Sequence, residues 1–373
     1  MSEVCTARCA SYEEAEVRRA IEGALAPLGG LDSFVRPGMK VLLKPNLLQR
    51  AQEDQAITTH PVVVRVVADL VRAAGGVVWI GDGPAGPVDN TRKLWRPLGM
   101  TDVAEATGAT LVPFESVQWS SHGGRDYFIA RPILDADLVI DLPKLKTHVL
   151  TLYTGAVKNL FGAIPGRRKR ELHLRAPGIK EFSDVLVDVF ELVPPSLTIM
   201  DGVLGMEGEG PGTTGTPKRL GVIAASADAV ALDTVVAEAM GYHRGQVLHL
   251  AEAGRRGLGE ADSRAITVLG DADALDFGRV ELASPRWVTK APRWVGEIVG
   301  RRLVLRPLVS PEVCIGCGKC VEVCPKDAII VGDDRVACFD LDECIGCLCC
   351  AEICPEAAIE TKRSLLTRLA KIR

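Results

Sequence analysis

The feature that most constrains this chain is a cysteine run that occurs twice near its end. The first run, CIGCGKCVEVCP, begins at Cys314, and the second, CIGCLCCAEICP, begins at Cys344. In each run, three cysteines spaced two residues apart can bind one face of a cuboidal iron–sulfur cluster, and the fourth, before a proline, turns toward a second cluster. Zinc also uses paired Cys-x-x-Cys, but it takes four ligands and has no use for eight in this repeat. The spacing therefore predicts two 4Fe–4S clusters.

The repeat resembles the two-cluster bacterial ferredoxins over residues 311–361, and that family is a small α+β domain with interleaved ligand sets. The resemblance implies that one cluster is held by Cys314, Cys317, Cys320 and Cys354. It implies that the other cluster is held by Cys344, Cys347, Cys350 and Cys324. Cys338 and Cys349 remain as spare thiols. The stretches 328–330 and 358–360, after the two prolines, are expected to form short paired strands.

Composition indicates a large globular protein in a reducing compartment. The chain has 373 residues, 47% of them hydrophobic, which is enough for two or three domains. Ten of its twelve cysteines follow residue 313, which indicates metal binding rather than a disulfide framework. The polar N-terminus lacks a secretory apolar region, and no apolar run is long enough for a bilayer, so we expect a cytoplasmic protein. The net charge of −4 gives no reason to expect nucleic acid as a partner.

Residues 1–284 alternate between apolar runs of strand length and helical patterns. Strands are expected at 41–43, 77–80, 138–140, 197–200, 220–224 and 266–269. Helices are expected at 13–25, 61–74 and 227–240, the last with Asp228 as its N-cap. Uninterrupted apolar strands separated by helices are typical of a mostly parallel sheet covered on both faces. The sequence predicts a doubly wound α/β domain followed by the small ferredoxin domain.

Polar residues follow these strands, at the edge where ligands bind in such sheets. We expect a cleft that binds an anionic small molecule through its ammonium and amide groups. The candidate ligand-binding residues are Lys44, Asn46, Lys144, Lys146, Lys158 and Asn159. The candidate catalytic groups are His148, Asp201 and Glu207, and the two acids could instead bind a divalent cation. The basic run 167–170 is interpreted as solvated surface, and no NAD or ATP fingerprint is present.

Several motifs of this region resemble a known family. They are KPNLL, ITTHP, GDGP, LPKLKTH, YTGAVKNLFGAIPG, DGVLGMEGEGPGTTG and DAVALD, spread over residues 35–245. They resemble domain-of-unknown-function family 362, whose members are described as iron–sulfur-centre proteins and often carry a C-terminal ferredoxin module. The resemblance implies the two-domain arrangement but no particular reaction.

Two basic segments flank the cysteine repeats, at 285–310 and 362–373. The first interleaves tryptophans with arginines, and the second is a short amphipathic tail. Such segments suit either a membrane surface or packing inside the molecule. Residues 311–360 hold eleven acidic and three basic residues, so we favour packing against this acidic domain.

Three functions remain open at this point. An oxidoreductase would relay low-potential electrons through two clusters to an anionic substrate in the cleft, with a protein as electron donor or acceptor. A non-catalytic electron-transfer subunit would deliver electrons to a partner enzyme. A non-redox protein would bind a ligand or sense oxygen or iron. We favour the oxidoreductase, because a fused electron relay beside a polar cleft gains effective concentration. Whether the α/β domain is catalytic stays open.

Overall fold

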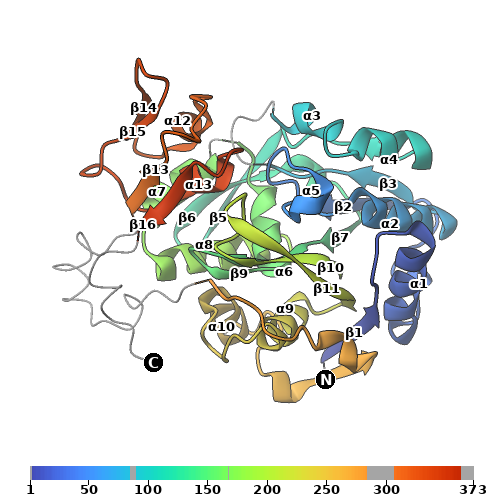
Figure 1. Cartoon of the computed structure of the whole chain (residues 1–373). Coiled ribbons are helices and arrows are strands. Elements are labelled where there is room, and N and C mark those ends of the chain that lie inside the picture. Colours follow the sequence, from blue (N-terminus) through green and yellow to red (C-terminus); the bar gives the residue numbers. More distant parts are fainter. Residues whose placement is uncertain (1, 85–89, 167, 284–305, 363–373) are drawn as a thin grey trace.

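The computed structural model describes residues 2–84, 90–166, 168–283 and 306–362 (Figure 1). A large sheet occupies the centre of the α/β domain, with strand order β12-β1-β11-β10-β7-β2-β3-β4 and with β8 and β9 beside β10. Its strands are β1 (Ser2–Arg8), β2 (Lys40–Pro45), β3 (Val77–Ile80), β4 (Thr110–Leu111), β7 (Leu138–Leu142), β8 (Lys144–His148), β9 (Leu152–Thr154), β10 (Leu197–Gly208), β11 (Gly215–Ser226) and β12 (Ile266–Gly270).

The sheet is mostly parallel, as predicted. β4, β3, β2, β7 and β10 run parallel to one another, and β12 runs parallel to β1. β11 is antiparallel to both β1 and β10, and it forms a long hairpin with β10. β8 continues the chain just after β7 and pairs with both β10 and β9. The carboxyl ends of the parallel strands β2, β7 and β10 therefore lie at the same edge of the sheet.

Alternate strand residues point to opposite faces, so the sheet separates two cores. Leu42 belongs to one core, and its neighbours Val41 and Leu43 belong to the other. One face is covered by α1 (Glu14–Leu25), α2 (Pro61–Ala73) and α4 (Met100–Thr107). The other is covered by α6 (Ala156–Asn159), α8 (Ile179–Leu192), α9 (Ala229–Ala239) and α10 (Leu248–Arg255). This arrangement confirms the doubly wound α/β prediction.

Local signals place the helix starts. Pro61 opens α2, where the fixed φ of proline suits the first helical position. Asp228 caps α9, because its Oδ1 accepts a hydrogen bond from Ala231 N at 2.9 Å. The remaining described elements are α3 (Asn90–Trp95), α5 (Arg131–Leu134), α7 (Arg168–Arg175), the short helix η4 (Leu160–Ala163) and the hairpin of β5 (Val117–His122) and β6 (Arg125–Ala130).

Residues 306–362 form a small module with its own core (Figure 1, orange and red). It contains β13 (Arg306–Val309), α12 (Lys319–Val323), β14 (Ile329–Val331), β15 (Ala337–Phe339), α13 (Cys349–Ile353) and β16 (Ile359–Lys362). The strands expected after the two prolines are present, and they pair as β14 with β15 and β16 with β13. Residues 306–309, assigned above to the linker, thus pair within this module. The segments 285–305 and 363–373 lie outside the described residues.

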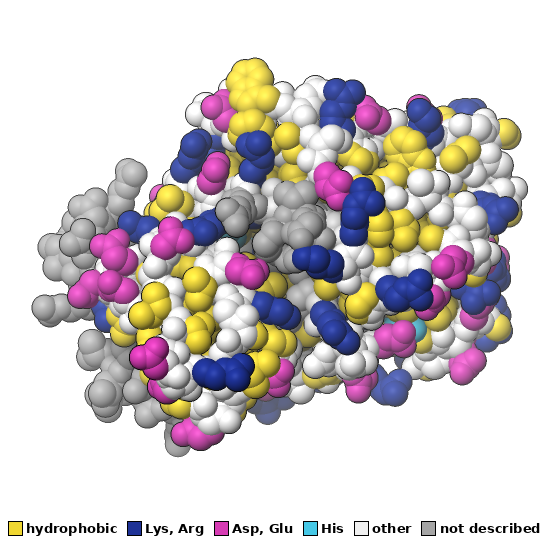
Figure 2. Space-filling view, turned by 90° about the horizontal axis from the view of Figure 1, so that it is seen from above, with side chains coloured by type: hydrophobic (Ala, Val, Ile, Leu, Met, Phe, Trp, Pro, Cys, Tyr) yellow, Lys and Arg dark blue, Asp and Glu magenta, His cyan; other side chains and the backbone are white. Residues whose placement is uncertain are grey.

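Basic and acidic side chains are mixed on the face of the molecule shown in Figure 2. Lys and Arg side chains are interspersed with Asp and Glu across the face seen in Figure 2, without a large area of one sign. Among the helices that the structure describes, none is long and apolar enough to span a membrane.

Candidate functional site

The carboxyl ends of the central strands carry a buried ion pair. Lys44, in β2, places its Nζ 2.7 Å from Asp82 Oδ1, just after β3, and both side chains are almost fully buried. The other oxygen of Asp82 accepts a hydrogen bond from Leu47 N at 2.8 Å. A β-carbon at Gly162 would lie 2.1 Å from Asp82 Oδ1 and 2.5 Å from Lys44 Nζ. Glycine is needed at this position, because any side chain would displace the pair.

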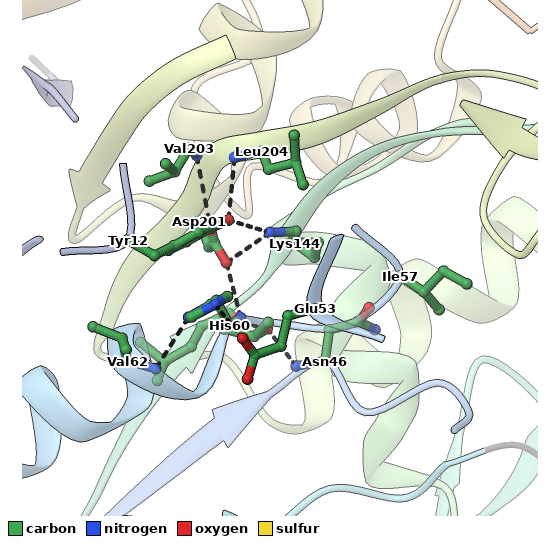
Figure 3. Close-up of polar contacts among 12 residues, drawn as sticks. Tyr12, Asn46, Glu53, Ile57, His60, Val62, Lys144, Asp201, Val203 and Leu204 are labelled. Carbon is green, nitrogen blue, oxygen red and sulfur yellow. Dashed lines mark hydrogen bonds and ion pairs between the residues drawn. The ribbon is translucent and has the colours of Figure 1, made fainter. Parts of the chain in front are cut away.

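A second buried network joins β8, β10 and the segment before α1 (Figure 3). Lys144 Nζ donates to Asp201 Oδ2 at 2.8 Å and to the Tyr12 hydroxyl at 2.6 Å, and that hydroxyl donates to Asp201 Oδ1 at 2.8 Å. The amide of His60 donates to the same carboxylate at 3.0 Å, and its ring stacks on Tyr12. Burial lowers the pKa of Lys144, and the Asp201 carboxylate opposes that shift. Asp201 is therefore held by internal partners.

A third network links Lys146 to two asparagines. Lys146 Nζ donates to Asn46 Oδ1 and to Ile57 O, both at 2.7 Å. Asn46 Nδ2 donates to Asn159 Oδ1 at 3.1 Å, and Asn159 Nδ2 donates to Asp141 Oδ1 at 2.7 Å. Burial lowers the pKa of Lys146 well below its ordinary value, and neighbouring lysines add to the effect. The chain of contacts ties the ends of β2, β7 and β8 to α6.

A pocket lies between the α/β domain and the C-terminal module. It encloses about 900 Å³, including space that opens to solvent. The α/β domain contributes residues of β8, α6, η4 and α7, and the module contributes residues of α12 and α13. The pocket therefore requires both parts of the chain.

His148, in β8, presents a neutral hydrogen-bond donor to this pocket. Its Nδ1 accepts hydrogen bonds from Leu150 N at 3.0 Å and Thr151 N at 3.4 Å, which places the proton of the neutral ring on Nε2. Nε2 lies 3.4 Å from Glu352 Oε1, without the alignment of a hydrogen bond. Burial lowers the pKa of His148 well below its ordinary value, and Lys158 adds to this shift. The ring is neutral at physiological pH.

Three cationic side chains line the pocket, and two of them have partners. Lys169 Nζ donates to Gly83 O, and Arg170 forms an ion pair with Asp327 of the module. Burial lowers the pKa of Lys169 to about 8. Lys158 has no hydrogen-bond or ion-pair partner among the residues that the structure describes. Its ammonium group is therefore available to a ligand.

An aromatic wall lines another side of the pocket. The ring of His173 stacks on Phe182 with centroids 4.1 Å apart. Phe161 packs edge-on against both rings. Burial lowers the pKa of His173 to about 3, and Lys158 contributes to this shift, so the imidazole is neutral. The wall is uncharged and suits a flat apolar group.

Two further cavities, inside the C-terminal module, contain the two sets of cysteines. One cavity, of about 370 Å³, is lined by Cys314, Cys317, Cys320 and Cys354. The other, of about 360 Å³, is lined by Cys324, Cys344, Cys347 and Cys350. The amides of Ala328 and Ala358 donate to the Sγ atoms of Cys324 and Cys354, each at 3.3 Å. Four thiols around one cavity, with amides directed at sulfur, fit a cuboidal cluster.

Helix α13 lies between the second cysteine cavity and the pocket. Cys350 and the preceding Cys347 line the cavity. Cys349 and Glu352 line the pocket. Residues three apart share a helix face, and adjacent residues do not, so one short helix serves both sites.

The tip of the β10–β11 hairpin contacts the C-terminal module. Thr213 Oγ1 donates to Cys354 O at 2.7 Å. A β-carbon at Gly212 would lie 2.7 Å from Glu352 O, so the backbones approach closely here. The glycine-rich loop after β10 therefore contacts α13 and the residue that follows it.

The predicted site residues fall into two groups. Asn46, Lys158, Asn159 and His148 line the pocket. Lys44, Lys144 and Lys146 instead stabilise the strand ends behind it, through the contacts given above. Sequence reasoning missed Lys169 and His173 as pocket residues, and it also missed Cys349 and Glu352. A signal existed for Cys349, because a spare cysteine next to a ligand in a helix must face away from the cluster.

The two acidic candidates do not come together. Asp201 is bound by Lys144 and Tyr12, while Glu207 pairs with Lys218 at 3.1 Å. In the described parts of the chain, no group of three or more His, Cys, Asp or Glu side chains is arranged to hold a single metal ion. Basic partners occupy both carboxylates, and a divalent cation at these two residues stays a prediction.

The chain is similar in sequence to a known protein and in structure to solved proteins. It is 36% identical, over 256 residues, to a thylakoid-associated protein of Synechocystis sp., covering 67% of this chain and 78% of that one. Among solved structures, a lactate racemase apoprotein from Thermoanaerobacterium thermosaccharolyticum matches 64% of this chain and 57% of its own, with 11% identity and a TM-score of 0.38. A protein from Thermotoga maritima matches 54% of this chain and 52% of its own, with 13% identity and a TM-score of 0.33.

Family models match both parts of the chain. A 4Fe–4S binding domain matches residues 307–330, which gives the C-terminal module the capacity for electron transfer. The domain of unknown function 362 matches residues 41–238, which span most of the central sheet and the pocket residues of β8, α6 and α7. The chain therefore belongs to the family of the domain of unknown function 362, and it carries a 4Fe–4S binding domain.

Proposed function

We propose that this protein is an iron–sulfur oxidoreductase that relays electrons through two 4Fe–4S clusters to an anionic small molecule in the pocket. The observation that carries the proposal is the position of α13, whose residues line both the second cysteine cavity and the pocket. A helix with its side chains is about 10–12 Å across, so two sites on different faces of this one helix are separated by a short path.

The ligands of the two clusters would be the two cysteine sets that line the cavities. When bound, the clusters supply single electrons at low potential. The amides of Ala328 and Ala358 donate to ligand sulfurs and would stabilise the more negative, reduced state. The cytoplasm, as a reducing compartment, would keep these thiols available for iron.

The residues of the pocket would bind and orient the acceptor. The Lys158 ammonium attracts an anion, and this attraction is stronger in a partly buried site than in bulk water. The Nε2–H of His148 adds a directional hydrogen bond. The module covers one side of the pocket through α12 and α13, which limits access of water to the bound molecule.

A non-catalytic electron carrier is the second candidate. Apolar side chains are exposed beside the first cysteine cavity, with Ile315 52% and Val313 43% exposed. Such a patch suits transient docking of an electron-donor or electron-acceptor protein. An enzyme would use the same patch to receive electrons, so the two candidates differ in whether the pocket is used.

Reoxidation of the reduced protein separates the candidates. The holoprotein is reduced anaerobically with dithionite, freed of excess reductant, and mixed with anthraquinone-2-carboxylate as an anionic acceptor. We expect saturable reoxidation in the wild type and a rate at least about tenfold lower in Lys158→Met, because the anion loses its cation. Lys180→Met, at an exposed surface lysine, should behave as the wild type. Ferricyanide should reoxidise all three equally.

A carrier would give a different result. In that case Lys158→Met and Lys180→Met would be reoxidised by the quinone at the same rate, without saturation. Rapid reoxidation only by a protein acceptor would likewise contradict the enzyme.

A further inference from the structure

The pocket is lined by two hydrogen-bond donors that differ in charge, the neutral imidazole of His148 and the ammonium group of Lys158. His148 is 1% exposed, and its Nε2–H has no hydrogen-bond partner among the described residues. Lys158 lines the same pocket and likewise has no hydrogen-bond or ion-pair partner among the described residues, and its charge lowers the pKa of His148. One ammonium and one neutral N–H can together satisfy the two oxygens of a single carboxylate.

The side chain of Glu352, in α13, places a carboxylate near one of these donors. Its Oε1 lies 3.4 Å from His148 Nε2 without hydrogen-bond alignment, and its charge opposes the lowered pKa of Lys158. The protein's own carboxylate therefore lies beside His148 without a hydrogen bond to it, and it lines the same pocket as Lys158. A ligand carboxylate would compete with Glu352 for the same two groups.

The remaining charges disfavour a phosphate. Lys169 and Arg170 already have partners, as described above. Asp82, Glu322 and Glu352 also line the pocket and would repel a dianion. The one ammonium group of the pocket without a partner in the described chain, that of Lys158, can balance a ligand with a single negative charge.

The apolar part of the pocket indicates the body of the ligand. Phe161, Phe182 and the neutral ring of His173 form its aromatic wall, and Val323 and Leu48 add aliphatic surface. A flat ring can stack or pack edge-on against such a wall, which a flexible polar chain cannot do.

We propose that this pocket binds a monocarboxylate on a flat aromatic or conjugated skeleton, with the carboxylate on Lys158 and His148 and the skeleton on the aromatic wall. This inference rests on the proposed function in one respect, because it names the chemical class of the substrate of that function. The site itself can be tested by binding alone, without electron transfer.

The test is calorimetric titration of the oxidised holoprotein, kept anaerobic, with benzoate. We expect saturable binding of benzoate, at least about tenfold tighter than the binding of each of three comparison ligands. These are benzamide, which is neutral, cyclohexanecarboxylate, which lacks the flat ring, and phenylphosphonate, which carries more charge. Equal or tighter binding of any of these three, or no binding of benzoate, would overturn the proposal.

Three variants test which side chains contact the carboxylate of benzoate. Lys158→Met and His148→Asn should each weaken benzoate binding about tenfold, and asparagine keeps an acceptor near the position of Nδ1 while it removes the Nε2 donor. Glu352→Gln should tighten binding several-fold, because it removes the competing charge. A purely structural role of these residues would not produce opposite signs, so weaker binding in all three would refute the assignment. Lys180→Met is the matched control.

A failure here is distinguishable from failure of the proposed function. If benzoate does not bind but 4-carboxy-TEMPO, an anionic one-electron acceptor without a flat ring, reoxidises the protein in a Lys158-dependent way, the oxidoreductase stands and the substrate class is wrong. If benzoate binds as expected but no acceptor reoxidises the protein, the pocket is right and the electron relay is wrong.

Discussion

Burial decides the role of each charged residue at the strand ends. Removing one member of a buried ion pair leaves an uncompensated charge, which costs about 3–5 kcal/mol. Lys44 and Lys144 have carboxylate partners within 2.8 Å, so their positions stabilise the fold. Lys158 has no such partner in the described chain, and it faces the pocket. Lysines that look alike in the sequence therefore have different roles.

Gly162→Ala tests the packing around the Lys44–Asp82 pair. The added β-carbon would lie 2.1 Å from Asp82 Oδ1, so the pair must separate. We expect a loss of about 3–5 kcal/mol in the free energy of unfolding, seen as a clearly lower Tm. Gly23→Ala in α1, where the β-carbon has ordinary contacts only, should instead stabilise by about 0.5–1 kcal/mol. An unchanged Tm for Gly162→Ala would contradict the close packing.

His249 gives a pH-dependent prediction. It is fully buried in α10, neither ring nitrogen has a partner among the described residues, and burial lowers its pKa to about 3. The folded pKa is below the unfolded value of about 6.5, so the folded state loses stability as pH falls from 6.5 toward 3, by about 1.4 kcal/mol per pH unit. His249→Leu should raise Tm, and by more at pH 5 than at pH 7.

The control for this prediction is the change of the exposed His243 to Leu, measured in the same way. Equal Tm differences for His249→Leu at pH 5 and pH 7 would show that His249 is not kept neutral by burial. The measurement is thermal unfolding of the anaerobic holoprotein at both pH values.

At the scale of elements, the β10–β11 hairpin connects the two parts of the chain. Thr213 donates to Cys354 O from the hairpin tip, whereas the adjacent Thr214 bonds to Glu209 O within its own loop. Thr213→Val should weaken docking of the module by about 1 kcal/mol and speed amide hydrogen exchange in α13 roughly fivefold. Thr214→Val should leave α13 exchange unchanged. Equal effects of both variants would contradict docking through Thr213.

The elements themselves were largely predictable from the sequence. The strands at 41–43 and 197–200 are uninterrupted apolar runs, and the start of α9 was marked by Asp228, so local patterns sufficed. The partners of Lys144 and Lys146 were not predictable, because Tyr12 and Asn46 reach them from segments 132 and 100 residues away along the chain. The pocket could not be predicted either, since it is closed by residues of α12 and α13, from a different part of the chain.

At the scale of the molecule, the two cysteine cavities have different surroundings. The first is bordered by the exposed Cys317 and Ile315. The second adjoins α13 and, through it, the pocket. The expected order of electron transfer is therefore from the surface to the first cluster, then to the second cluster, and then to the pocket.

The most direct measurement of this order compares two variants, each designed to lose one of the two proposed clusters. Cys317→Ser changes a cysteine that lines the first cavity, and Cys344→Ser changes one that lines the second. The wild type should contain about eight iron atoms per chain and each variant about four. After dithionite reduction, we expect anthraquinone-2-carboxylate to reoxidise Cys317→Ser at a rate close to that of the wild type and Cys344→Ser at least about tenfold more slowly. The opposite order of rates, or equal rates, would contradict the account.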